Sequence, residues 1–391
     1  MAKKRTKRRQ DYTAAGIVAA VLMTVVTVIL GMQAVKLINP PSGGTDIAKT
    51  YGPEGWYLVY RSYYVADRGD EGGSEDDTVT YEFMRFPLDG SALVSESVTK
   101  IERGGTRAAA PWMSKVDDRT LLFARRTDDA VWTDVSGSEL RALGDHPDVD
   151  VLWTGLPSPD GSRVAFFDAE VGAPAVVAED GTRIFSADGP SSFMPFKWRR
   201  ENVLYLSGEP VSSGMSRSLW RANVAVGEVE EVPGVLELEL TDFDLNLEAG
   251  LLVGNRFVCD NVETCGVPPS SLHLLDITTG ESVELAASDT SVFADVRLSP
   301  DASRIAFTVT EGDQSDVWVT DVEASGHERR VTSGNLLDWT PNGNALIVDR
   351  DGELQIVSLG DGSVRTIARR SGRYPDSDFH GIDYVGVVGK R

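Results

Sequence analysis

Histidine and cysteine are scarce in this chain, which has four of the former and two of the latter among 391 residues. Zinc sites and Cys/His catalysis need clusters of these side chains, so the counts leave little room for either. Basic residues are outnumbered as well, with 38 Lys and Arg against 60 Asp and Glu and a net charge of -22. A phosphate backbone must be met by clustered Lys and Arg, so we expect no nucleic-acid partner.

Sequence motifs of common catalytic centres are also missing. The chain contains no G-x-S-x-G nucleophile elbow, no phosphate-binding P-loop and no H-E-x-x-H zinc motif. The four histidines fall in different repeat units, which favours satisfied or solvated imidazoles over a shared metal site. We therefore expect no enzymatic activity, no catalytic or metal-ligating residue and no cofactor.

The charge is unevenly distributed along the chain. Residues 1–38 carry seven basic residues and one acidic residue, a net charge of +6, which leaves -28 for residues 39–391. An uncharged apolar run of 24 residues lies between Asp11 and Lys36. Because a helix of about 20 apolar residues crosses a bilayer, this run predicts a transmembrane helix over residues 12–38.

Two neighbouring segments set the expected topology. Residues 1–11 form a basic tail, and basic residues stay on the cytoplasmic side of a membrane. A cleaved signal peptide is the alternative, but its apolar region is usually shorter. Residues 39–50 contain Pro-Pro-Ser-Gly-Gly and predict a linker. We thus expect a single-pass protein of a cell membrane. Its N-terminal helix contacts the lipid bilayer, and residues 51–391 are extracytoplasmic.

Beyond the linker, almost no stretch keeps the 3.6-residue hydrophobic period of an amphipathic helix. Short runs rich in β-branched and aromatic residues alternate instead with clusters of Gly, Asp, Pro and Ser. This pattern is typical of strands joined by turns, and it predicts an all-β domain.

One unit recurs along this domain. The segment SPDGSRVAFF at 158–167 returns as SPDASRIAFT at 299–308 and as TPNGNALIV at 340–348. In each copy Pro fixes one backbone angle and Asp or Asn followed by a small residue accepts the turn dihedrals, so each predicts a tight turn that leads into a buried strand. A weaker copy at 198–202 keeps its Trp and a turn but loses the Pro.

The spacing of the repeats predicts the architecture. Seven anchor residues precede the turns, 41 to 61 residues apart. A period of about 40–50 residues with four strands per unit is typical of a β-propeller blade. We predict about seven four-stranded blades, although six or eight also fit the spacing. The anchors are Tyr51, Trp112, Pro157, Trp198, Leu245, Leu298 and Trp339.

The two ends of the predicted propeller complement each other. An eighth anchor would fall near Tyr384, but the segment 379–388 has room for only one strand. The first unit in turn has little sequence for its opening strand, because Pro40 to Gly44 precede it. We predict that the C-terminal strand completes the first blade and removes an open sheet edge.

The Ser-Pro-Asp-Gly-x-x-Ile/Val-Ala-Phe core at 158–167 and 299–307, with the weaker copy at 340–348, resembles the repeats of TolB-type β-propellers, which are relatives of the WD-type repeat. The resemblance implies a propeller of the bacterial cell envelope, typically a platform for protein partners. Family propellers also precede catalytic domains in prolyl oligopeptidase-type enzymes and occur in some lyases. Four of the seven units lack the Ser-Pro-Asp core, and a predicted anchor replaces the family's periplasmic N-terminal domain.

Two further features are candidate sites. Cys259 and Cys265 bracket five residues between strand-like runs, and outside the cytoplasm they predict a disulfide at a hairpin tip, with free thiols as the alternative. The first strand of each blade lines the central channel, where acidic residues could hold a cation such as Ca²⁺ or a basic peptide. The alternative, which we favour, is that these carboxylates bond to backbone between blades. They are Asp150, Asp244, Asp295, Asp338 and Asp383.

These features rank three functional hypotheses. The first is a membrane-tethered, non-enzymatic propeller that binds an envelope protein or a cell-wall polymer. The second is a ligand- or cation-sensing module that uses the acidic channel. The third is a glycan lyase or hydrolase, in which carboxylates on the loops perform acid–base chemistry.

Overall fold

A computed structural model describes most of the predicted β domain. The predicted tail, transmembrane helix and linker lie outside the described residues, as do Asp150, Cys259 and Cys265. Within the described part, no helix is long and apolar enough to span a membrane. The structure describes residues 55–66, 78–89, 96–104, 113–115, 120–124, 130–134, 139–143, 156–160, 162–168, 171–178, 182–186, 194–200, 202–208, 217–257, 269–323, 328–369 and 377–389.

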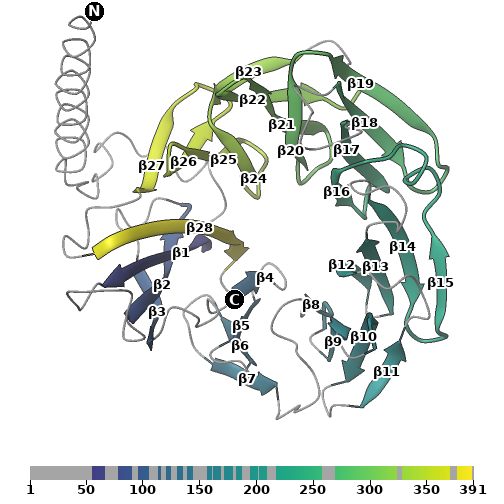
Figure 1. Ribbon diagram of the computed structural model, residues 1–391, viewed down its shortest axis with the longest axis horizontal. Coiled ribbons are helices and arrows are strands. Elements are labelled where there is room, and N and C mark those ends of the chain that lie inside the picture. The colour runs from purple at the N-terminus through teal and green to yellow at the C-terminus, as the bar shows by residue number, and fades with distance from the viewer. Residues whose placement is uncertain are drawn as a thin grey trace, which may run out of the picture.

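The described strands form seven four-stranded antiparallel sheets that follow one another around a common centre (Figure 1). The all-β prediction is confirmed, and the arrangement is that of a β-propeller with the predicted seven blades. We call the sheets blades 1 to 7 in chain order. In blades 2 to 7 the first strand of each blade lies nearest the centre (Figure 1).

The strand bounds follow the repeat. Blade 1 combines β28 (Ser377–Gly389), β1 (Trp56–Ala66), β2 (Thr78–Pro87) and β3 (Glu96–Gly104). Blade 2 contains β4 (Met113–Lys115), β5 (Thr120–Ala124), β6 (Ala130–Asp134) and β7 (Glu139–Leu143), and blade 3 contains β8 (Leu156–Pro157), β9 (Arg163–Asp168), β10 (Ala173–Ala178) and β11 (Arg183–Ser186). Blade 4 contains β12 (Met194–Arg200), β13 (Val203–Gly208), β14 (Ser218–Asn223) and β15 (Glu228–Glu231).

The last three blades keep the same order. Blade 5 contains β16 (Asp242–Asn246), β17 (Leu251–Phe257), β18 (Ser270–Asp276) and β19 (Ser282–Ser288). Blade 6 contains β20 (Val292–Leu298), β21 (Arg304–Glu311), β22 (Gln314–Asp321) and β23 (Arg329–Ser333). Blade 7 contains β24 (Asn335–Trp339), β25 (Ala345–Arg350), β26 (Glu353–Ser358) and β27 (Val364–Arg369).

The C-terminal strand closes blade 1, as the sequence predicts. β28 pairs with β1 in an antiparallel ladder that runs from Trp56 opposite Gly389 to Ala66 opposite Ser377. β28 therefore occupies the innermost place of a blade whose other three strands come from the start of the domain (Figure 1). This pairing covers the inner edge of β1, which would otherwise be left without hydrogen-bond partners.

Apolar side chains fill the spaces between neighbouring blades. One buried cluster joins blade 7 to blade 1 through residues such as Ile347 and Leu58. Another joins blade 5 to blade 6 through Val253 and Phe307. Burial of each such side chain contributes about 1.5–3 kcal/mol, and most of it is gained only when two blades meet. The blades are therefore expected to stabilise one another rather than to fold singly.

The recurring turns share one hydrogen-bond network. In blade 6, Ser299 Oγ donates to Asp301 Oδ1 at 2.6 Å and accepts from the Arg304 backbone N–H at 2.9 Å. Equivalent pairs of bonds occur around Ser158 in blade 3 and around Thr340 in blade 7. All three hydroxyl-bearing residues are fully buried, so each turn satisfies polar groups that would otherwise cost free energy.

Candidate functional site

A cavity of about 1990 Å³ lies at the centre of the propeller. Its wall comes largely from the channel strands β12, β16, β20, β24 and β28 and from the turns that follow some of them. Four of the five aspartates predicted for the channel line this cavity: Asp244, Asp295, Asp338 and Asp383. Because the fifth, Asp150, lies outside the described residues, the site can be built from four.

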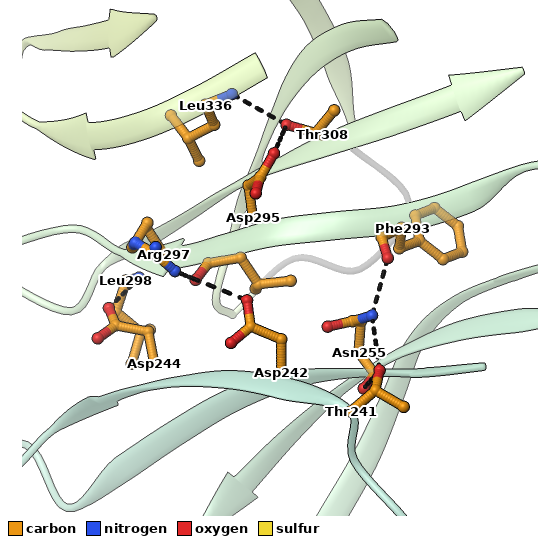
Figure 2. Close-up of polar contacts among 11 residues, drawn as sticks. Thr241, Asp242, Asp244, Asn255, Phe293, Asp295, Arg297, Leu298, Thr308 and Leu336 are labelled. Atoms are coloured by element: carbon orange, nitrogen blue, oxygen red, sulfur yellow. Dashed lines mark hydrogen bonds and ion pairs between the residues drawn. The ribbon is translucent and has the colours of Figure 1, made fainter. Parts of the chain in front are cut away.

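Asp244 and its neighbour Asp242 connect blade 5 to blade 6 (Figure 2). The Asp244 Oδ2 atom accepts the backbone N–H of Leu298 at 2.9 Å. Asp242 Oδ2 lies 4.0 Å from Arg297 NH1, an ion pair across the same boundary. Asn255 strengthens this boundary, because its Nδ2 donates to the carbonyl of Phe293 at 2.8 Å (Figure 2).

Asp295 sits where the channel strand of blade 6 is irregular. The pairing of β20 shifts between Ala294 and Arg297, and Asp295 has a positive φ of 49°. A β-bulge of this kind turns a side chain away from its regular direction. The carboxylate accepts the hydroxyl of Thr308 at 2.9 Å, and that hydroxyl accepts the Leu336 N–H of blade 7 at 2.9 Å (Figure 2). Burial raises the pKa of Asp295 above its ordinary value.

The remaining two aspartates make contacts in or with blade 1. Asp338 joins blade 7 to blade 1, and Asp383 joins β28 to β1 within blade 1. Asp338 accepts the Trp339 N–H at 2.7 Å and the Tyr384 hydroxyl at 2.6 Å. Burial raises the pKa of Tyr384 well above its ordinary value, and the nearby charge of Asp338 raises it further. Asp383 accepts Nε of Arg61 at 3.0 Å.

All four carboxylates thus have hydrogen-bond donors. Asp244 and Asp338 bond directly to a neighbouring blade, and Asp295 is linked to one through Thr308. This is the arrangement expected if they hold the ring together. Among the residues that the structure describes, no group of three or more His, Cys, Asp and Glu side chains is placed to bind a metal ion. The cation-binding role of these aspartates stays a prediction.

Tryptophan anchors add a second set of contacts between blades. The indole N–H of Trp198 donates to the Leu156 carbonyl of blade 3 at 2.8 Å. That of Trp339 donates to the Arg297 carbonyl of blade 6 at 3.1 Å. Arg304 approaches Trp339 from the blade 6 turn, with its guanidinium carbon 5.3 Å from the centre of the ring. These two anchors therefore bind blades 4 and 7 to the blade that precedes each of them.

The cavity also has a basic wall that the sequence reasoning did not single out. Lys197, Arg199 and Arg200 line it from β12 of blade 4. The Lys197 ammonium donates to the Leu245 carbonyl of blade 5 at 2.6 Å. The sequence does contain an indication of this basic wall. Arg199 and Arg200 occupy the two positions at which blades 3, 6 and 7 have Ser-Pro or Thr-Pro.

Comparison with known proteins finds a short sequence match to TolB. No protein-family model matches the chain. Over 43 residues the chain is 51% and 49% identical to the Tol-Pal system protein TolB of two strains of Anaeromyxobacter dehalogenans. The match spans 11% of this chain and 10% of those relatives. Together with the seven sheets, this similarity supports a TolB-type propeller fold.

Solved propeller structures resemble the chain over more of its length. TolB of Acinetobacter baumannii is 13% identical, with a TM-score of 0.39 over 84% of this chain and 81% of that one. Oligogalacturonate lyase of Vibrio parahaemolyticus is 10% identical, with a TM-score of 0.48 over 76% and 87%. An oligogalacturonate lyase in complex with manganese is 12% identical, with a TM-score of 0.47 over 66% and 76%.

Proposed function

We propose that this protein is a non-enzymatic binding platform of the cell envelope, tethered to the membrane by its N-terminal segment, and that its central cavity receives part of a protein partner. The observation that carries the proposal is that the aspartate side chains of the cavity wall bond to other parts of the ring. The four described channel aspartates accept hydrogen bonds within the ring, and the cavity, at about 1990 Å³, has the volume to hold a peptide segment.

The bonds of Asp295 support a role in holding the ring together. Its carboxylate accepts the Thr308 hydroxyl, which in turn accepts the Leu336 N–H of the next blade. The short similarity to a protein named for the Tol-Pal system also favours a protein of the envelope as the partner.

Crosslinking in the native membrane tests this function. The full chain, tagged at its C-terminus, is crosslinked in intact cells and purified, and bound proteins are identified by mass spectrometry. The control is a chain that lacks residues 378–391, which removes most of β28 and opens blade 1. We expect one envelope protein that is enriched with the full chain and lost with the control.

Two results would overturn the proposal. The first is the absence of any protein enriched by the full chain over the control. The second is cleavage of cell-wall polysaccharide by the purified full chain, because a lyase or hydrolase needs no stable protein partner.

A further inference from the structure

Blade 4 departs from the turn chemistry that blades 3, 6 and 7 share. In blades 3, 6 and 7 a Ser or Thr with a buried hydroxyl follows the anchor and closes the turn. After Trp198 the chain instead continues with Arg199 and Arg200, so no hydroxyl is available to close the turn. Departures from a locally consistent rule concentrate at functional sites, where stability is given up for another property.

A β-bulge places these arginines at the cavity. The pairing of β12 with β13 shifts between Trp198 and Arg200, so Arg199 is an extra residue in the channel strand. Bulges redirect side chains, and here both arginines are exposed and line the cavity. In blade 5 the pairing continues past the anchor without a shift, and in blades 6 and 7 the channel strand ends at the anchor.

Among the residues that the structure describes, the two guanidinium groups have no counter-ion. Elsewhere in the cavity wall Arg297 reaches Asp242, and nearby in blade 1 Arg61 bonds to Asp383. In the part of the chain that the structure describes, Arg199 and Arg200 form neither a hydrogen bond nor an ion pair through their side chains. The net charge of -22 already favours solubility, so these two cations are not needed for it. Their unpaired guanidinium groups can instead bind an anion.

We propose that Arg199 and Arg200 form a carboxylate-binding site for an acidic peptide segment of the protein partner. The planar guanidinium group pairs with a carboxylate through two parallel N–H···O bonds, so two such groups on neighbouring residues of one cavity wall can bind two carboxylates. The site rests on the proposed function, since it specifies which chemistry the partner brings into the cavity.

The rest of the cavity wall selects a peptide over an anionic polymer. Asp244, Asp338 and Glu248 line the same cavity, and the carboxylate of Glu248 is exposed. A polymer with a negative charge on every unit would bring some of these charges against the acidic wall and be repelled. A peptide can carry its carboxylates at the arginines and neutral residues elsewhere.

A binding assay on the full chain in detergent micelles tests the site. The probe is a fluorescein-labelled dodecapeptide of Gly, Ser and Tyr that contains two adjacent Glu residues, and its counterpart has Gln in their place. Binding is measured by fluorescence polarisation for the wild type and for R199Q/R200Q. The matched control is R217Q/R350Q, which removes the same charge from two exposed arginines outside the cavity lining.

We expect the Glu peptide to bind the wild type and the control equally, and R199Q/R200Q to weaken its binding at least tenfold. The Gln peptide is expected to bind at least tenfold more weakly to the wild type. R199K/R200K keeps the charge but loses the planar fork, so an intermediate affinity is expected. Thermal melting of each variant shows whether the ring is intact.

Three results would overturn the site: no binding of the Glu peptide to the wild type, equal loss of binding in R217Q/R350Q, or tighter binding of a uronate oligomer than of the peptide. Repeating the crosslinking with R199Q/R200Q separates the two proposals. If the variant captures the partner as the wild type does, the carboxylate site is wrong and the platform function stands. If the wild type captures no partner, the platform function fails whatever the peptide does.

Discussion

The hydroxyl of Tyr384, in the C-terminal strand β28, donates a 2.6 Å hydrogen bond to Asp338 Oδ2 in the channel strand of blade 7. This bond joins the last sheet of the ring to the first, at the place where strands from the two ends of the domain meet. It also keeps Tyr384 neutral, because burial and the charge of Asp338 both raise the pKa of the phenol.

Removal of this hydroxyl is expected to weaken the ring closure. Tyr384→Phe leaves the half-buried Asp338 with one fewer donor, and the loss of such a hydrogen bond costs about 0.5–1.5 kcal/mol of the free energy of unfolding. Urea denaturation of the full chain measures the change. Tyr57→Phe is the control, because the described contact of Tyr57 is through its ring, over which Arg85 lies. An equal loss in both variants would show that the Asp338 bond has no special role.

The same tyrosine predicts an alkaline limit of stability. Its folded pKa lies above the unfolded value of about 10, so its contribution to stability is complete below pH 10. The contribution is lost as the pH rises from about 10 toward the folded pKa. Urea midpoints between pH 8 and pH 11 should therefore fall for the wild type and fall less for Tyr384→Phe. Parallel curves would contradict the assignment.

Two equivalent turn positions predict opposite effects of substitution. Ala302 has a φ of 56°, and Gly343 has a φ of 67° at the same position of the blade 7 turn. A left-handed conformation strains an alanine but not a glycine. Ala302→Gly should raise the free energy of unfolding by about 0.5 kcal/mol, and Gly343→Ala should lower it by about 1 kcal/mol. Effects of the same sign would refute this explanation.

The turn in blade 7 between β26 and β27 predicts that part of the folding stability is lost at acid pH. The Ser358 hydroxyl and the Ser363 N–H lower the pKa of Asp361 to about 2. Because the unfolded value is higher, the contribution of Asp361 is present above about pH 4 and is lost as the pH falls toward 2. Thermal melting at pH 5 and pH 3 should show a smaller difference for Asp361→Asn than for the wild type. An unchanged difference would contradict this.

The indole bonds between blades are expected to be worth more than an indole bond inside one strand. Trp339→Phe keeps most of the buried ring but leaves the Arg297 carbonyl without its donor, which should cost about 1–2 kcal/mol. Trp220→Phe is the comparison, because its indole N–H bonds to Ser218 on the same strand. Chemical denaturation decides between them, and a larger loss for Trp220→Phe would show that the contact between blades is unimportant.

The repeat could be predicted from the sequence because each turn is specified by residues that are close together in the chain. Pro300 and Asp301 specify a turn through their own dihedrals and hydrogen bonds, so the copies and their spacing could be recognised. A bond from Asp244 to the backbone of another blade is the favoured expectation, but its partner Leu298 is 54 positions away and cannot be identified from the sequence. The direction of Arg199 could not be predicted, because it depends on a bulge that the composition of β12 does not reveal.

Closure of blade 1 by β28 has a consequence for biosynthesis. The inner edge of β1, which ends at Ala66, has no partner until residues 377–389 have been made. Chains elongate at about 5–20 residues per second, so the inner edge of β1 stays unpaired for roughly 20–60 s. During that interval the nascent chain depends on its other surroundings for protection against aggregation. A ribosome that stalls before the final strand would release a chain that cannot complete its ring.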